Sequence, residues 1–284
     1  MSLSFRFGTV GSPAATPPRP GGSVGGIKCI ADLGMDTLEL AWVSGVRVSE
    51  ATCAAIKETA LAHGVVLSIH APYYINLNAE DEKWPRLRKY LMDAAYFGNL
   101  AGATDVVFHP GTYFNRPVDE VMGVVIPRLS ACAEELHAVG NPITLRPETM
   151  GKSAVIGSLQ DILGMAKAIP GILPCMDFAH LHARHGDGSM NSYEEWIQAL
   201  EACKNSLGEA AMQRLHVHLS GIEYGPKGER NHLVMEEADL DFKSIFRALK
   251  DSGCKGRILC ESPVLEEDAL KMKTLWQKIS GEAA

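Results

Sequence analysis

The sequence predicts an α/β fold, a single (β/α)8 TIM barrel that spans residues 1–284, and three observations support this prediction. Apolar runs of about four to six residues recur along the chain, roughly 30–40 residues apart. Segments with helical periodicity lie between them, which is typical of buried parallel strands joined by crossover helices. The chain has 284 residues and 46% hydrophobic content, and barrels of about 250 residues are commonly single domains. An open, doubly wound sheet of eight strands is the main alternative.

Eight strand–helix pairs fill the chain. The expected strands cover residues 5–10, 37–42, 65–70, 105–109, 143–148, 172–177, 215–219 and 257–261. The expected helices cover residues 24–33, 49–63, 81–101, 118–139, 159–168, 192–204, 242–252 and 265–279. Ser49 is suited to begin the second helix and Gly64 to end it. We interpret the Pro- and Gly-rich stretch 11–26 as the loop after the first strand, with a disordered N-terminal arm as the alternative.

The net charge of −7 argues against a protein that coats nucleic acid by bulk attraction. A local basic rim could still bind phosphates, although each of these residues is individually typical of solvated surface. The candidates for such a rim are Arg86, Arg88, Lys89, Arg116, Lys152, Arg184, Lys227 and Arg230.

Two further features bear on the cellular compartment. No apolar run reaches 18 residues and no basic segment precedes an apolar one at the N-terminus, so we expect neither a membrane span nor a signal peptide. The seven cysteines form no CxxC pair, which indicates free, hydrophobic thiols instead of a disulfide framework or a thiolate zinc site. Both features favour a cytoplasmic protein.

Six of the predicted strands end on a side chain that can bind metal. These residues are His70, His109, Glu148, Asp177, the pair His216 and His218, and Glu261. In a barrel such strand ends converge on one face. Any one of them is commonly a hydrogen-bonded structural residue, but burying several together without metal or partners would cost several kcal/mol each. Convergent imidazoles and carboxylates are ligands for zinc or a similar divalent ion.

The histidines near these strand ends differ in how well their positions suit a metal ligand. His180 lies three residues beyond Asp177, so one tight turn can point both inward. His182 and His185 follow, with a polar loop as their alternative explanation. His216 and His218 alternate with apolar residues and share one face of their strand, and the later one lies nearer the mouth.

In motif and order, the chain resembles the endonuclease IV family of apurinic/apyrimidinic endonucleases, within the xylose-isomerase-like barrel superfamily. The matching motifs are H-x-x-Y-x-I-N-L at residues 70–77, F-H-P-G at 108–111, E-T-x-G at 148–151, D-x-x-H at 177–180, H-L at 218–219 and the glutamate of ILCESP at 261. The resemblance implies a zinc-dependent hydrolase that cuts DNA 5′ to abasic sites in base-excision repair.

The resemblance also implies a site with two or three Zn²⁺ ions, with Mn²⁺ as a substitute. The implied metal ligands are His70, His109, Glu148, Asp177, His180, His218, His232, Glu261 and Glu229. Glu148 would bridge two ions, and we assign Glu148 and Glu261 to catalysis. The expected substrate contacts are Tyr73, Asn76, Arg184 and Arg230, and Tyr73 and Tyr74 could stack on a nucleotide or pack on the rim. We expect a monomer whose partner is DNA with abasic sites, and no membrane.

The sequence departs from the family at two places. The family has Asp-Arg-His in the third-metal loop, whereas this chain has Glu229, Arg230, Asn231 and His232. We prefer the alignment that uses His232 with Glu229 in place of Asp, because Asn231 is a poor zinc ligand. The strand containing Glu39 also lacks the family's DNA-gripping pattern. Glu39 could be an interior residue, a substrate contact or a salt-bridged strand residue.

Two other functions compete with the phosphodiesterase. A sugar or sugar-phosphate isomerase or epimerase of the same superfamily uses one divalent ion held by carboxylates, Asp and His. Such an enzyme has little need of His70, His109 and His180 around further ions. A metal-binding or lesion-binding protein without turnover is the third possibility.

Overall fold

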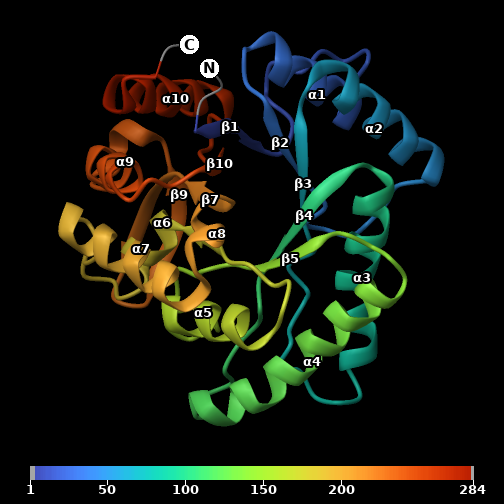
Figure 1. Cartoon of the computed structure of the whole chain (residues 1–284), viewed down its shortest axis with the longest axis vertical. Helices are drawn as coiled ribbons and strands as arrows, with labels where there is room; N and C mark the ends of the chain where they lie inside the picture. The colour runs from blue at the N-terminus through green and yellow to red at the C-terminus, as the bar shows by residue number, and fades with distance from the viewer. Residues whose placement is uncertain (1–3, 283–284) are drawn as a thin grey trace.

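Eight parallel strands form a barrel with helices on its outside (Figure 1). The structure is a computed structural model and describes residues 4–282. The strands follow the order β5-β4-β3-β2-β1-β10-β7-β6. A parallel bridge between Glu148 and Cys175 joins the two ends of this sheet, just beyond β5 and at the start of β6. The predicted barrel is therefore confirmed over the open sheet.

All eight predicted barrel strands are present. They are β1 (Phe5–Val10), β2 (Thr37–Ala41), β3 (Val66–His70), β4 (Ala103–Phe108), β5 (Thr144–Pro147), β6 (Cys175–Asp177), β7 (Leu215–Leu219) and β10 (Gly256–Cys260). Only β6 is much shorter than expected. Pro174 immediately precedes it and has no N–H for the strand ladder, which accounts for the late start.

The eight predicted helices also form, with ends shifted by a few residues. They are α1 (Gly22–Asp32), α2 (Glu50–His63), α3 (Trp84–Leu100), α4 (Val118–Ala138), α5 (Leu159–Ala168), α7 (Tyr193–Leu207), α9 (Phe242–Asp251) and α10 (Glu266–Ser280). The Ser49 side chain accepts a hydrogen bond from the Thr52 amide, and Gly64 ends α2 with a φ of 67°. Both capping predictions are confirmed.

The Pro- and Gly-rich stretch after β1 is an ordered loop that becomes α1 at Gly22. The carboxylate of Glu266 accepts hydrogen bonds of 2.8 Å from the amides of both Ala14 and Ala15, which fastens this loop to α10. These contacts favour the loop interpretation over a disordered arm.

The sequence did not predict the short elements in the loops that follow β6 and β7, nor a short helix between α7 and β7. These are α6 (Phe178–Ala183), α8 (Glu209–Met212), a 3-10 helix at Met235–Glu237, and a hairpin of β8 (Gly221–Gly225) and β9 (Gly228–Leu233). Asp177 begins α6, because its Oδ1 accepts a 2.6 Å hydrogen bond from the His180 amide. The hairpin and α6 extend from the carboxyl ends of β7 and β6, where a TIM barrel holds its functional residues.

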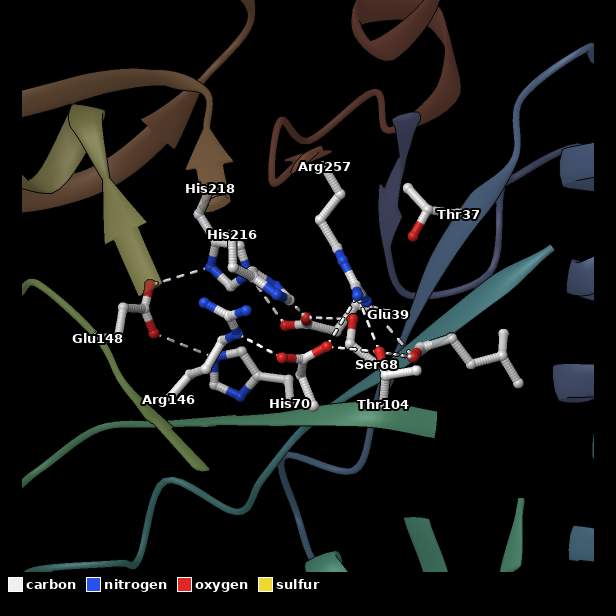
Figure 2. A network of polar contacts seen from close by, with 12 residues as sticks. Thr37, Glu39, Ser68, His70, Thr104, Arg146, Glu148, His216, His218 and Arg257 are labelled. Carbon is white, nitrogen blue, oxygen red and sulfur yellow. Dashed lines mark hydrogen bonds and ion pairs between the residues drawn. The ribbon is translucent and has the colours of Figure 1, made fainter. Parts of the chain in front are cut away.

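The barrel interior contains charged layers as well as apolar ones. Near the start of the strands, buried Asp105 pairs with Arg146 at 2.5 Å and with Arg257 at 2.7 Å. Figure 2 shows Arg146 and Arg257 in the same network as Glu39, His216 and His218. His216 pairs in register with Arg257, and His218 lies two residues further along β7, toward the mouth. Polar residues therefore connect the barrel floor to the strand ends.

Two compartment-related observations complete the fold. All seven cysteines are free and buried, as the sequence predicts. Within residues 4–282, the helices are too short or too polar to cross a membrane.

Candidate metal centre

The first ligand group lies at the ends of β3, β4 and β5. The Nε2 atoms of His70 and His109 lie 3.5 Å and 3.3 Å from Oε2 of Glu148. The other ring nitrogen of His70, Nδ1, lies 3.0 Å from the Ala71 carbonyl. A hydrogen bond there fixes the tautomer with a free Nε2, which is the atom turned toward Glu148. These three residues form a group whose ligand atoms lie close enough to share an ion.

The second group uses the other oxygen of Glu148. Its Oε1 lies 3.0 Å from Nδ1 of His218, which in turn lies 3.5 Å from Oε1 of Glu261. Asp177 and Glu261 belong to the same cluster of ligand atoms as Glu148. The two oxygens of one buried carboxylate thus face two separate groups, as a bridging ligand requires.

The third group joins α6 to the hairpin. Nε2 of His180 lies 3.6 Å from Oε2 of Glu229, and His232 completes the group. Nδ1 of His180 lies 2.9 Å from the Thr149 carbonyl, so Nε2 is its free nitrogen. His180 also lies within the second cluster, but we assign it to the third group because that hydrogen bond occupies Nδ1.

A bulge in the hairpin places Glu229 and His232 on the same face. Glu223 pairs with Asn231, whereas the next residue, Tyr224, pairs with Glu229, so Arg230 is an extra residue. Residues three apart in a regular strand point to opposite faces, and one inserted residue corrects this alternation. Asn231 points away and donates a 3.1 Å hydrogen bond to Glu223. The geometry therefore favours the alignment that uses His232.

Two motif glycines leave room for the centre. A Cβ on Gly151 would lie 2.7 Å from Cβ of Glu229 and 3.1 Å from Cδ2 of His180. A Cβ on Gly111 would lie 2.1 Å from Oδ1 of Asn76, and its φ of +119° also suits glycine. These contacts give a packing reason for the glycines of E-T-x-G and F-H-P-G.

The electrostatics of the centre call for a cation. Burial and the nearby Glu261 and Glu148 carboxylates raise the pKa of Asp177 to about 7, although His180 opposes the shift. Burial lowers the pKa of His70, but the Glu148 carboxylate 3.5 Å away outweighs this and raises it to about 9. Among the described residues, Glu148 Oε2 and Asp177 Oδ2 are buried oxygens without a hydrogen-bond partner. Orphaned buried carboxylate oxygens beside imidazoles fit a divalent ion well.

His182 and His185 lie outside the centre. His182 is held by Asp239 at 3.1 Å and by the Ser189 carbonyl at 3.0 Å, and His185 is exposed. The polar-loop explanation holds for His185 and is wrong for His182, which lies in α6 and is fully buried as a hydrogen-bonded structural residue.

The expected substrate contacts divide into exposed and buried residues. Tyr73 is 54% exposed, and its ring centroid lies 6.2 Å from that of His109. Arg230 is exposed but pairs with Glu223 at 3.3 Å. Asn76 accepts hydrogen bonds from the amides of its own loop and the next one. Arg184 is buried and donates to the carbonyls of residues 150, 152 and 155, so its guanidinium braces this loop.

The basic rim is largely neutralised by acidic partners. Arg88 pairs with Glu135, Lys89 with Asp93, and Arg116 with Glu120. The other rim candidates are exposed and form no ion pair among the described residues; these are Arg86, Lys152 and Lys227. Any phosphate contacts would therefore come from a few scattered cations.

Sequence reasoning missed the residues that support the ligands. Thr149 bonds both the amide and the carbonyl of Asp177, and Ser220 contacts Nδ1 of His232 at 2.6 Å. The sequence offered one signal for them, because Thr149 directly follows Glu148 and Ser220 lies two residues after His218. Glu39 was noticed but left without a role, and it lies 3.0 Å from His218.

This chain matches one family model and is similar to several known proteins. Residues 27–278 match the model of the xylose isomerase-like TIM barrel family. An uncharacterized protein of Methanocaldococcus jannaschii is 34% identical over 96% of this chain and 97% of its own length. Endonuclease 4 of Thermus thermophilus is 27% identical over 75% of this chain and 74% of its own length.

Solved structures show the same fold at lower identity. A crystal structure of endonuclease IV from Thermus thermophilus superposes with a TM-score of 0.70 at 20% identity, covering 98% of this chain and all of that one. A D-tagatose 3-epimerase-like protein gives 0.71 at 21% identity, covering 91% and 96%. The family match over most of the chain, together with the 34% identical relative, shows that this protein belongs to the xylose isomerase-like TIM barrel family.

Proposed function

We propose that this protein is a zinc-dependent phosphodiesterase that hydrolyses DNA 5′ to abasic sites. The observation that carries the proposal is the arrangement of three ligand groups, two of which share Glu148. One ion held by a tetrahedral set would need only four ligands. His70 and His109 on one side, and His180, Glu229 and His232 on the other, exceed that need.

The proposed reaction adds a water oxygen to phosphorus, breaks the bond from phosphorus to O3′ of the preceding nucleotide, and returns a proton to that oxygen. The products are a 3′-hydroxyl and a 5′-phosphate. Divalent ions held by these ligand groups would lower the pKa of water and stabilise charge on the entering and leaving oxygens. Glu148 would keep the first two ligand groups at a fixed separation, because it belongs to both. Glu261 would contribute to the second group and accept a proton from water.

Tyr73 is the residue that we propose for contact with the substrate. Its half-exposed ring lies beside His109 at the edge of the first ligand group. Aromatic rings at such positions can stack on an unpaired base or fill the gap at an abasic site. Tyr74 and Phe114 are also exposed and line a neighbouring cavity of about 640 Å³. We further propose that the protein acts as a cytoplasmic monomer.

A sugar epimerase is the second candidate, and a specific observation favours it. The ligand atoms of Glu148, Asp177, Glu261 and His180 lie close enough to share one ion, and His218 lies 3.0 Å from Glu148 and 3.5 Å from Glu261. Such a set could hold one ion and a sugar while carboxylates move a proton. Under this function the first and third groups would serve no ion.

A nicking assay separates the two functions. A DNA duplex with one abasic-site analogue should be cut 5′ to the lesion, leaving a 3′-hydroxyl, by protein purified without chelator. Chelator should abolish cutting, and Zn²⁺ or Mn²⁺ should restore it, whereas an undamaged duplex should stay intact. Metal-loaded protein that leaves the duplex intact but interconverts epimeric ketoses would overturn the proposal in favour of the epimerase.

A further inference from the structure

Glu39 is a fully buried carboxylate on β2 that contacts the imidazole of His218 from inside the barrel. Its Oε1 lies 3.0 Å from Nε2 of His218. Its Oε2 accepts a 2.7 Å hydrogen bond from the Ser68 hydroxyl and lies 2.9 Å from Nε2 of His216. Figure 2 shows Glu39 surrounded by these three side chains, with His218 between Glu39 and Glu148. Glu39 is therefore fixed on one oxygen and turned toward His218 with the other.

Among the proposed ligands within residues 4–282, His218 is the one histidine whose second nitrogen faces a carboxylate outside the ligand groups. The equivalent nitrogen of His70 faces the Ala71 carbonyl, and that of His180 faces the Thr149 carbonyl. The corresponding nitrogen of His232 faces the Ser220 hydroxyl. The contact between Glu39 Oε1 and His218 Nε2 is an ion pair at 3.0 Å, and both atoms are buried with no other hydrogen-bond partner. The imidazole of His218 is therefore the one with a carboxylate directly behind it.

We propose that Glu39 is a positioning residue for the second ligand group, holding His218 with Nε2–H toward the barrel interior and the Nδ1 lone pair toward Glu148 and Glu261. This inference rests on the metal centre of the proposed function. Glu39 makes no contact with the proposed ions and acts only through His218. A carboxylate behind a ligating imidazole raises the basicity of the ligating nitrogen and fixes the ring orientation.

The three ligand groups should therefore bind their ions with different affinities. The ion held by His218 gains from Glu39, whereas the first and third groups have only neutral support. Loss of such a partner commonly lowers metal affinity by about 10- to 100-fold. Glu39→Gln keeps the size of the side chain and removes its charge, so it should weaken one ion selectively.

The experiment measures stepwise metal release to a competing chelator from wild type, Glu39→Gln and control variants. We expect Glu39→Gln to release one ion at a chelator concentration about 10- to 100-fold lower than wild type requires, with the other ions released as in wild type. In protein loaded with cobalt, only one component of the visible absorption should shift. Asp105→Asn is the matched control, because Asp105 is equally buried in the barrel but pairs with Arg146 and Arg257.

Two further variants keep the test decisive. Ser68→Ala removes one donor to Glu39 but keeps the carboxylate, so it should loosen the same ion by a smaller factor, even if Glu39→Gln does not fold. His216→Gln should also have a smaller effect, because His216 contacts the other oxygen of Glu39, Oε2, and leaves the carboxylate beside His218 in place. Wild-type protein that binds no ion would overturn the metal centre itself. Wild type that binds ions, with an unchanged release profile in Glu39→Gln and Ser68→Ala, would overturn only the role of Glu39.

Discussion

Oε2 of Glu148 and Nε2 of His109 approach to 3.3 Å at the mouth of the barrel. The other oxygen of the same carboxylate faces His218 at 3.0 Å. Glu148 is completely buried, and its pKa is held well below the ordinary value by His218, His109 and His70, although burial opposes this. One ionised carboxylate thus couples two ligand groups that come from opposite sides of the barrel.

Glu148→Gln should separate these two groups. An amide offers one weak oxygen ligand in place of two charged ones, so we expect turnover to fall by several orders of magnitude and metal content to drop by at least one ion per chain. Activity on an abasic duplex and elemental analysis measure the two effects. Glu223→Gln on the hairpin is the control, since Glu223 contacts Arg230 and Asn231 only and should leave both unchanged. A metal-loaded Glu148→Gln protein with normal turnover would refute the bridging role.

The sequence predicted the barrel and the convergence of the first two ligand groups because both depend on regular elements. An apolar strand that ends on His70, Asp177 or Glu261 fixes where that side chain will lie once the sheet closes. The third group depends on irregular backbone. Glu229 and His232 reach His180 only through a hairpin and a one-residue bulge, and no local pattern in this loop encodes the register shift. For this reason, the sequence favoured His232 over Asn231 only because Asn is a poor zinc ligand, and not from any predicted position of the two side chains.

Substitutions in the hairpin test the bulge directly. His232→Ala should empty the third group and reduce the metal content by about one ion, because His232 supplies one of its two imidazoles. Asn231→Ala should keep that ion, since its amide only bonds the exposed Glu223. Both substitutions remove partly or fully exposed side chains, so stability should change little. Loss of the third ion in Asn231→Ala, with retention in His232→Ala, would support the other alignment.

Gly151→Ala should disturb the third group without removing a ligand. The new methyl would lie 2.7 Å from Cβ of Glu229 and 2.8 Å from its Oε2, so β9 must move away. We expect a destabilisation of about 1–3 kcal/mol, typical of an overpacked site, together with weaker binding of one ion. Thermal unfolding and chelator competition measure the two effects. Gly123→Ala, in α4 with open space around it, should instead raise stability by about 0.5–1 kcal/mol.

Buried polar residues inside the barrel were the least predictable from the sequence. Arg184 looked like a surface cation, yet three backbone carbonyls of the loop at residues 150–155 bind its guanidinium. Glu39 looked like one of several kinds of strand residue. Its partners, Ser68 and His216, lie 29 and 177 residues away, and only closure of the barrel brings them together. Such long-range pairings leave no periodicity in a single chain.

Metal uptake by the metal-free protein should release protons. Burial lowers the pKa of His180, but the charges of Asp177 and Glu148 outweigh it and raise the value to about 9, the same value as for His70. Both imidazoles are therefore protonated between about pH 7 and 8 without metal, and must lose that proton to bind an ion.

Calorimetry in buffers of different ionisation enthalpy counts these protons. We expect at least two protons to be released near pH 7.5, from His70 and His180, with apparent affinity rising with pH. His218 should add to this count, because Cys175 and the carboxylates around it raise its pKa well above the ordinary value, although burial opposes the shift. The raised pKa values also stabilise the metal-free fold below about pH 6.5, and this stabilisation is lost as the pH rises toward 9. The metal-free protein should thus become less stable across this range while the metal-loaded protein does not. A metal affinity independent of pH from about 6 to 9 would show that these imidazoles are neutral before the ions bind.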